Sequence, residues 1–257
     1  MDWQEISGNW VLVPPRPTAI VHFLGGAFVA AAPQVTYRAL LEFLADQGYV
    51  VVATPFINTF DHEAIARQVA RAFEQTLDYL QSRVLKRRYL PIYGVGHSMG
   101  CKLHLLIGSM LQSERAGNVF VSFNNFPARR SIPFFEQFSQ FAPAFDVEFT
   151  PSPLETFRLI ERHYPVRRNL LIQFTADDID QTGSLMEVML RRFPDLTTLH
   201  TLKGNHLTPL GQDLKWQAGS AFTPLDAIGQ FMRQEVFRDF NHLKRTMLLW
   251  MNPLAKV

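Results

Sequence analysis

Short apolar runs rich in β-branched residues alternate along the chain with longer segments in which apolar residues recur every three or four positions. The first pattern is typical of strands buried on both faces, and the second is typical of amphipathic helices. This alternation predicts an α/β fold, with a mostly parallel central sheet that carries helices on both faces. The predicted strands cover residues 10–13, 19–23, 49–53, 89–95, 118–123, 170–174 and 196–202, and the predicted helices cover residues 37–47, 61–85, 100–111, 185–192 and 225–250.

The alternation stops between residues 126 and 165, a segment rich in phenylalanine and interrupted by several prolines. A single α/β domain routinely uses roughly 250 residues, so we expect one domain over residues 1–257 with a small cap inserted at 126–165. The aromatic side chains of this cap either pack on the domain or line an apolar pocket above the active site, and the sequence leaves both open.

The composition excludes several classes of protein. Hydrophobic residues make up 47% of the 257 residues and charged residues 19%, which is typical of a folded chain rather than a disordered one. The formal net charge is only +2, and the basic residues stand in short pairs such as Arg129-Arg130 instead of one long basic stretch. We therefore expect no nucleic-acid partner.

The cysteine content and the apolar runs indicate the compartment. Cys101 is the only cysteine in the chain, which excludes an internal disulfide or a thiolate metal site and favours a reducing environment. The first residues show no signal-peptide pattern, and the most apolar run, residues 19–32, is shorter than the roughly 20 residues of a membrane span. We expect a soluble cytoplasmic protein without a transmembrane segment.

The most specific motif is Gly96-His97-Ser98-Met99-Gly100, which lies between a predicted strand and a predicted helix. In this strand–turn–helix context, Gly-x-Ser-x-Gly indicates a serine nucleophile held on a sharp, strained turn. Side chains at positions 96 and 100 would collide with the turn, which explains the two glycines. The helix that follows adds positive potential and free N–H groups where an oxyanion would form.

The same glycines, together with Gly94, also fit a dinucleotide-binding loop. That loop is normally followed about 20 residues later by an acidic residue that binds the ribose. Here the next strand ends in Asn124-Asn125, without an acid, so the nucleophile interpretation is favoured and no cofactor is expected. The spacing of the His, Cys and carboxylate residues does not indicate a metal site either.

A nucleophilic serine needs a general base, and the base needs an acid that orients it. His206 follows the last predicted strand, and three aspartates, Asp177, Asp178 and Asp180, follow the strand before it. Serine, aspartate and histidine thus follow one of the chain orders known for catalytic triads. We take Asp178 as the acid, because it lies far enough beyond its strand to turn back toward His206, while Asp177 and Asp180 remain alternatives.

A tetrahedral oxyanion would need two N–H donors close to Ser98. The residue after a nucleophile on such a turn supplies one of them, so we assign Met99. The loop after residues 19–23 supplies the other, and Leu24 is our choice. Gly25 and Gly26 would support a turn in which the backbone approaches the ligand closely.

These segments together resemble the α/β-hydrolase superfamily and, more narrowly, the DUF1350 family, hydrolase-like proteins of photosynthetic lineages. The resemblance extends over essentially the whole chain. It implies the α/β-hydrolase fold, and it matches Ser98, Asp178 and His206 to nucleophile, acid and base. One departure concerns the oxyanion loop, where the superfamily often has His-Gly and this chain has His22-Phe23. The segments that carry the resemblance are residues 10–15, 21–28, 48–56 and 96–104.

From the residues and the resemblance we predict a serine hydrolase that cleaves a carboxylic ester or thioester through an acyl-enzyme intermediate. The partner would be a small-molecule ester with a hydrophobic acyl group, or a lipid, and the triad needs no cofactor or metal. The alternative is a binding or assembly protein that keeps the fold without catalysis. We expect His22, His97, His104 and Cys101 to have packing roles instead of chemical ones.

Overall fold

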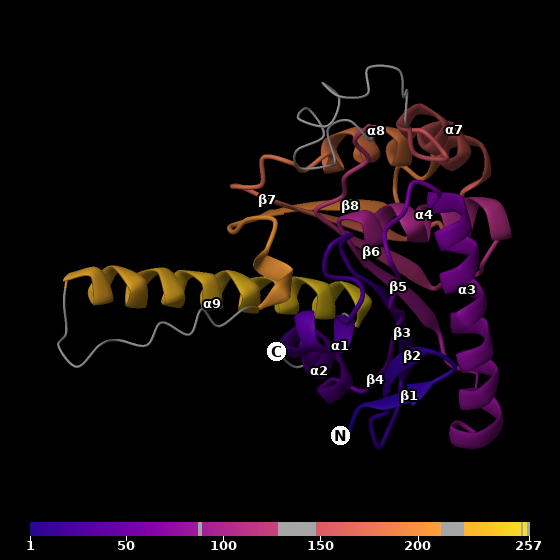
Figure 1. The fold of residues 1–257 in the computed structure, drawn as a ribbon, viewed down its shortest axis with the longest axis horizontal. Coiled ribbons are helices and arrows are strands. Elements are labelled where there is room, and N and C mark those ends of the chain that lie inside the picture. Colours follow the sequence, from indigo (N-terminus) through magenta and orange to yellow (C-terminus); the bar gives the residue numbers. More distant parts are fainter. Residues whose placement is uncertain (87–88, 128–147, 212–223, 253, 256–257) are drawn as a thin grey trace, which may run out of the picture.

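Among the described residues, eight strands form one sheet in the order β1-β2-β4-β3-β5-β6-β7-β8 (Figure 1). β1 pairs with β2 and β2 with β4 in antiparallel fashion, and every other neighbouring pair is parallel. The computed structural model describes residues 1–86, 89–127, 148–211, 224–252 and 254–255, with only the backbone of 224–236. The strands are β1 (Gln4–Ile6), β2 (Asn9–Leu12), β3 (Ala19–Leu24), β4 (Tyr49–Ala53), β5 (Ile92–His97), β6 (Gly117–Val121), β7 (Asn169–Phe174) and β8 (Thr197–Leu202).

Helices cover both faces of this sheet (Figure 1). α2 and α9 pack on one face, and α3, α4, α7 and α8 pack on the other. In the described part of the chain, no helix is both long enough and apolar enough to cross a membrane. The predicted fold class, a mostly parallel sheet between two helical layers, is confirmed. The helices are α1 (Pro33–Thr36), α2 (Arg38–Asp46), α3 (His62–Tyr79), the π-helical turn η1 (Leu80–Val84), α4 (Met99–Leu111), α7 (Pro153–His163), α8 (Thr182–Arg192), the 3-10 turn η2 (Thr208–Leu210) and α9 (Pro224–Met251).

The central strands are buried because both of their faces are apolar. All five residues of β4 are buried, and their side chains alternate between the two faces of the sheet. Val51 belongs to the cluster that includes α2 and α9, whereas Val50 and Val52 pack in a cluster with Phe73 of α3. The strand predicted at residues 49–53 is confirmed to the residue.

The long helix predicted from Asp61 to about Leu85 is divided into two parts. α3 begins as expected, since Asp61 Oδ1 accepts a hydrogen bond from the N–H of Ala64 at 2.8 Å. After Tyr79 the chain continues as η1, in which the N–H of Leu85 donates to the carbonyl of Leu80 at 2.7 Å. In a regular α-helix, residues five apart face different sides. The wider π-helical turn instead brings Leu80 and Leu85 to the same side, where both are buried in one apolar cluster.

The boundaries of the first strands and of β5 differ from the prediction. β5 begins at Ile92 rather than at residue 89, because Pro91 has no N–H to donate to a sheet. It extends to His97, two residues beyond the predicted end, so that the strand leads directly into Ser98. The three-residue β1 escapes prediction because Gln4–Ile6 is too short and too polar to show a strand pattern.

The segment predicted as a cap, residues 126–165, is described only in part. Residues 128–147 lie outside the described residues. Residues 153–163 form α7, which connects β6 to β7 and begins with a capping box. Ile160 of α7 packs in a cluster with Leu105 of α4, so this part of the segment belongs to a helical layer of the main domain.

Candidate active site

Ser98 occupies a strained turn between β5 and α4. Its backbone φ is 55° and its ψ is −118°, a conformation that residues with a side chain rarely adopt. A Cβ on Gly96 would lie 2.6 Å from the backbone nitrogen of Cys101, and a Cβ on Gly100 would lie 2.0 Å from the carbonyl oxygen of Leu24. The steric reason predicted for these two glycines is confirmed.

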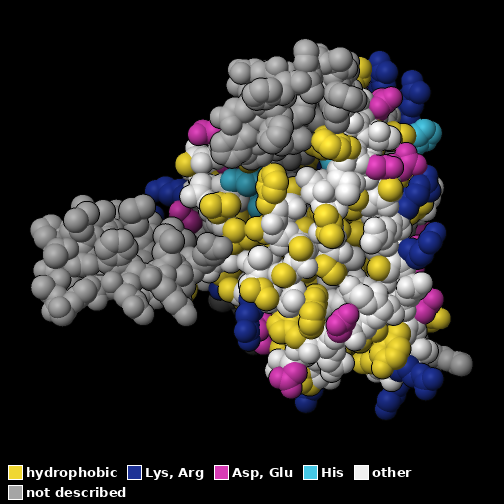
Figure 2. Space-filling view, viewed as in Figure 1, with side chains coloured by type: hydrophobic (Ala, Val, Ile, Leu, Met, Phe, Trp, Pro, Cys, Tyr) yellow, Lys and Arg dark blue, Asp and Glu magenta, His cyan; other side chains and the backbone are white. Residues whose placement is uncertain are grey.

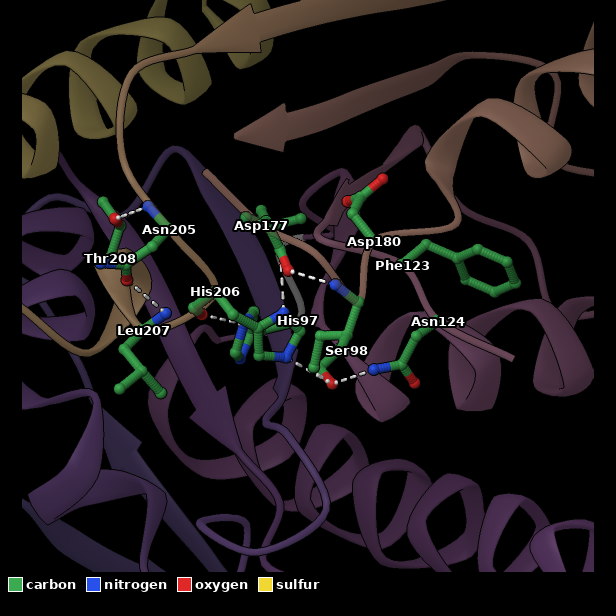
Figure 3. Close-up of polar contacts among 12 residues, drawn as sticks. His97, Ser98, Phe123, Asn124, Asp177, Asp180, Asn205, His206, Leu207 and Thr208 are labelled. Atoms are coloured by element: carbon green, nitrogen blue, oxygen red, sulfur yellow. Dashed lines mark hydrogen bonds and ion pairs between the residues drawn. The ribbon is translucent and has the colours of Figure 1, made fainter. Parts of the chain in front are cut away.

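Three side chains from three loops meet at this turn (Figure 3). His206 follows β8, and its Nε2 lies 3.0 Å from Ser98 Oγ. Asp177 follows β7, and its Oδ2 lies 2.8 Å from His206 Nδ1. Because β5, β7 and β8 run parallel, their carboxyl ends share one edge of the sheet, where serine, imidazole and carboxylate form a continuous hydrogen-bonded chain.

The polarity of this chain follows from the carboxylate. The side chain of Asp177 is fully buried, and burial raises its pKa, but the contact with His206 and the N–H of Ile179 at 3.2 Å lower it. The net shift is downward, so Asp177 is ionised at neutral pH and can only accept hydrogen bonds. His206 therefore carries its proton on Nδ1, and the hydroxyl of Ser98 donates to Nε2.

The structure corrects the choice of acid made from the sequence. Asp178 is exposed, whereas its neighbour Asp177 contacts His206. Asp177 Oδ1 accepts the N–H of Ile179 two residues later, and this Asx turn directs the carboxylate back toward the histidine one residue earlier than expected. Asp180 serves α8 instead, because its carboxylate accepts the first N–H of that helix at 2.7 Å.

Hydrogen bonds hold the loop that carries His206. The N–H of Asn205 donates to Thr208 Oγ1, and the N–H of Leu207 donates to Asn205 Oδ1, both at 2.9 Å (Figure 3). Asn205 and Thr208 hold this loop in place, and the sequence analysis missed both. The signal for them is the short polar turn pattern on both sides of His206.

A buried pair, His97 and Tyr37, connects this loop to the glycine loop after β3. Burial lowers the pKa of His97 to about 3, so the ring is neutral, and its Nε2 donates to the carbonyl of His206 at 2.9 Å. Tyr37 Oη lies 2.7 Å from His97 Nδ1, and it accepts the N–H of Gly26 at 2.8 Å. A Cβ on Gly25 would lie 2.7 Å from the ring of Tyr37, so both glycines let the loop approach this tyrosine. The packing role predicted for His97 is confirmed.

The two predicted oxyanion donors lie beside the strained turn. Met99 is the first residue of α4, where an N–H has no acceptor within the helix, and the side chain of Ser98 does not cap it. Leu24 ends β3, and its carbonyl lies against the turn. Met99 remains our predicted donor, whereas the N–H of Gly26 is already bonded to a tyrosine. Leu24 does not suit the role predicted for it, because it pairs with Gly96 in the ladder between β3 and β5. Its N–H faces β5, as does that of Ile20, which donates to the carbonyl of Pro91.

A further polar side chain, Asn124, contacts Ser98 (Figure 3). Its Nδ2 lies 2.9 Å from Ser98 Oγ. Asn124 follows β6, the strand that pairs with β5, so the sheet places it beside the turn. Sequence reasoning noted this residue only because it is not an acid. Asn124 directly follows β6, and β6 lies next to β5, the strand that leads to Ser98. This position is the signal that could have identified it.

Other groups near the turn have structural roles. Cys101 is fully buried, burial raises the pKa of its thiol, and its Sγ donates to the carbonyl of Gly96 at 3.2 Å. His104 is buried as well, and its Nε2 donates to the carbonyl of Val95 at 3.2 Å. The packing roles predicted for both are confirmed. Within the described residues, no three His, Cys, Asp or Glu side chains are placed to bind a metal ion.

Solved structures similar to this chain share its architecture. XC6422 from Xanthomonas campestris, a member of the a/b serine hydrolases without lid, is 12% identical, with a TM-score of 0.56 over 100% of this chain and 96% of that one. FphF, a fluorophosphonate-binding serine hydrolase of Staphylococcus aureus, is 12% identical, with a TM-score of 0.55 over 93% and 96%. The esterase Pf2001 of Pyrococcus furiosus is 16% identical, with a TM-score of 0.52 over 88% and 84%. At these identities the likeness shows the fold alone.

Sequence comparison identifies the family. No curated protein matches the chain. The profile of the family described as "Protein of unknown function (DUF1350)" matches residues 2–253. The protein therefore belongs to the DUF1350 family, and it has the α/β-hydrolase fold.

Proposed function

We propose that this protein is a serine hydrolase that cleaves a carboxylic ester or thioester with a hydrophobic acyl group. The observation that carries the proposal is the hydrogen-bonded chain from Ser98 through His206 to Asp177, built on a strained turn at the N-terminus of a helix. A serine, an imidazole and an ionised carboxylate in this order are the groups that acyl transfer needs.

In the first step, Ser98 Oγ attacks the carbonyl carbon of the substrate while His206 Nε2 takes the hydroxyl proton. The electron pair of the C=O bond moves onto the carbonyl oxygen, where the N–H of Met99 stabilises the charge. Asp177 stabilises the imidazolium ion and keeps Nε2 directed at the serine. His206 then protonates the departing alkoxide or thiolate as its bond to the acyl carbon breaks, and an acyl-enzyme remains.

In the second step, water replaces the alcohol or thiol. His206 Nε2 removes a proton from the attacking water, and a second tetrahedral intermediate forms at the same carbon. This intermediate collapses when Nε2 returns the proton to Ser98 Oγ, which releases the carboxylic acid. The side chain of His206 is 20% exposed, so water can reach the base in the acyl-enzyme.

Exposed apolar side chains at the same edge of the sheet support a hydrophobic substrate. They stand on the loops that follow β3, β4, β7 and β8, four parallel strands whose carboxyl ends lie at the edge of Ser98. Figure 2 shows hydrophobic side chains gathered on one face of the molecule, with histidine side chains at their margin. An acyl chain or a lipid would shield such a surface from water. The exposed side chains are Phe28 (76%), Ile57 (77%), Ile179 (46%) and Leu207 (61%).

A fluorophosphonate probe tests the proposal directly, because it phosphonylates only an activated serine. We expect the purified protein to be labelled at Ser98, as identified by peptide mass mapping, and Ser98→Ala to be unlabelled. We also expect hydrolysis of p-nitrophenyl esters, faster with butyrate or octanoate than with acetate. In Ser98→Ala, kcat should fall by about 10⁶-fold.

Absence of both labelling and hydrolysis in folded wild-type protein would contradict the proposal. Equal labelling of Ser98→Ala would contradict the assignment of the nucleophile. Circular dichroism of both proteins provides the control for folding.

A further inference from the structure

Among the residues that the structure describes, Ser98 Oγ has two hydrogen-bond partners, and only one of them belongs to the triad. Its single proton lies toward His206 Nε2, at 3.0 Å. Asn124, at 2.9 Å, must therefore present its NH₂ group, because an amide oxygen at that distance would face a second acceptor. The side chain of Asn124 thus donates an N–H directly to the reacting atom (Figure 3).

The backbone around Asn124 is fixed to the start of α8. The N–H of Asn125 donates to Gln181 Oε1 at 2.6 Å, and the N–H of Gln181 donates to the carbonyl of Phe123 at 2.7 Å. The N–H of Phe123 donates in turn to Thr182 Oγ1 at 3.2 Å. A donor on so firmly held a segment is preorganised, which is the property that makes a hydrogen bond effective in a transition state.

The glycine loop after β3 offers fewer free N–H donors to this site than its sequence suggests. A Cβ on Gly26 would lie 3.4 Å from Ser98 Cβ, so this residue comes close to the nucleophile. Its N–H nevertheless donates to Tyr37 Oη and is unavailable to an oxyanion. A donor from elsewhere would therefore add to the stabilisation that the N–H of Met99 provides.

We infer that Asn124 is a further catalytic residue whose side-chain N–H stabilises the tetrahedral oxyanion, an inference that rests on the proposed function. When Oγ attacks, its proton moves to His206, the Oγ–C bond forms and the C=O electron pair moves onto the carbonyl oxygen. In this tetrahedral intermediate Oγ is a neutral ether-type oxygen and a weaker acceptor than the negatively charged oxyanion. The oxyanion is bonded to the same carbon, so the Nδ2–H of Asn124 reaches it by a small rotation.

Two substitutions separate a donor from a residue that only fills space. In Asn124→Ala we expect kcat for p-nitrophenyl butyrate to fall by about 100-fold, the usual effect of losing one oxyanion donor, with KM within about 3-fold. Asn124→Asp keeps the shape of the side chain but replaces the N–H donor with an acceptor. The fall in kcat at pH 8 should therefore be at least as large as in Asn124→Ala. An activity of Asn124→Asp close to that of the wild type would overturn the inference.

Phenylboronic acid distinguishes the oxyanion from the resting serine, because it forms a tetrahedral adduct with a reactive serine hydroxyl. Its inhibition constant should rise in Asn124→Ala by a factor similar to the fall in kcat/KM. An unchanged inhibition constant would show that Asn124 acts only on the free hydroxyl and would overturn the inference. Wild-type labelling by fluorophosphonate together with full activity of Asn124→Ala would overturn the role of Asn124 alone. Inactive wild-type protein would overturn the proposed function and this role with it.

Discussion

His206 and His22 both have hydrogen-bond partners on two ring nitrogens, yet their surroundings suit them to opposite tasks. His206 lies at the carboxyl edge of the sheet, 20% of its side chain is exposed, and its Nδ1 faces the carboxylate of Asp177. His22 is fully buried within β3, where its Nδ1 accepts from Arg115 at 3.1 Å and its Nε2 donates to Thr54 Oγ1 at 3.0 Å. A carboxylate and solvent face the first imidazole, whereas burial and neighbouring basic side chains disfavour an imidazolium ion at the second.

The hydrogen bonds that start at His22 and run through Thr54 connect only structural polar groups within the described residues. Thr54 Oγ1 donates to Asn9 Oδ1, Asn9 Nδ2 donates to Thr76 Oγ1 at 2.8 Å, and Thr76 Oγ1 donates to a backbone carbonyl at 2.8 Å. Burial, and then two neighbouring basic side chains, lower the pKa of His22. The structural role expected for it is confirmed. A carboxylate partner and access to solvent, rather than hydrogen bonding itself, distinguish the candidate base from the structural histidine.

Removing the carboxylate of Asp177 tests this distinction with the largest expected effect. In Asp177→Asn, kcat should fall by about 10⁴-fold, because an amide no longer holds the proton on His206 Nδ1 or stabilises the imidazolium ion. The matched variant Asp178→Asn should retain activity within about twofold, since that side chain is exposed. The measurement is the initial rate of p-nitrophenyl butyrate hydrolysis at saturating substrate.

Unfolding temperatures of both variants control for damage to the loop. A large loss of activity in Asp178→Asn, with the activity of Asp177→Asn unaffected, would identify Asp178 as the acid, as chosen from the sequence. Wild-type activity in both variants would show that neither carboxylate takes part in the mechanism.

Acidification should act on the structural histidines through stability rather than through catalysis. Burial lowers the pKa of His62, His97 and His104 to about 3, and that of His22 is lowered too, against 6.5 for an unperturbed imidazole. Between these pH values the unfolded chain binds protons that the folded chain does not. The free energy of unfolding should thus decrease as the pH drops below 6.5, by about 1.4 kcal/mol per pH unit for each histidine.

Urea unfolding followed by tryptophan fluorescence between pH 4.5 and 9 measures this slope. His62→Phe is a matched control, because His62 stacks on Phe149 at 4.2 Å and neither ring nitrogen has a hydrogen-bond partner among the described residues. The variant removes one titrating ring without breaking a described hydrogen bond, so its slope should be shallower. A free energy of unfolding independent of pH from 7 to 4.5 would contradict the prediction.

The residues that the sequence and the structure both place at the candidate site depend on local spacing. Ser98 is flanked by glycines that sterics demand, and His206 follows a strand whose end is visible in the pattern of apolar residues. The choice between Asp177 and Asp178 depends instead on a turn that reverses the direction of successive side chains. Asn124 depends on how two adjacent strands align, and one-dimensional patterns contain no such alignment.

The smallest expected effect concerns the bridge between the two loops. Tyr37→Phe removes one oxygen and leaves His97 Nδ1 and the N–H of Gly26 without partners in a buried site, which should lower the free energy of unfolding by about 1–3 kcal/mol. It should also reduce kcat by roughly tenfold or less, because His97 then supports the His206 loop less firmly. Tyr93→Phe is the matched control, since it also loses one buried hydrogen bond, at the opposite end of β5. Stability assays and rates of fluorophosphonate labelling should show a loss of stability in both variants but slower labelling only in Tyr37→Phe. Equal labelling rates would mean that the bridge stabilises the fold without helping to position the base.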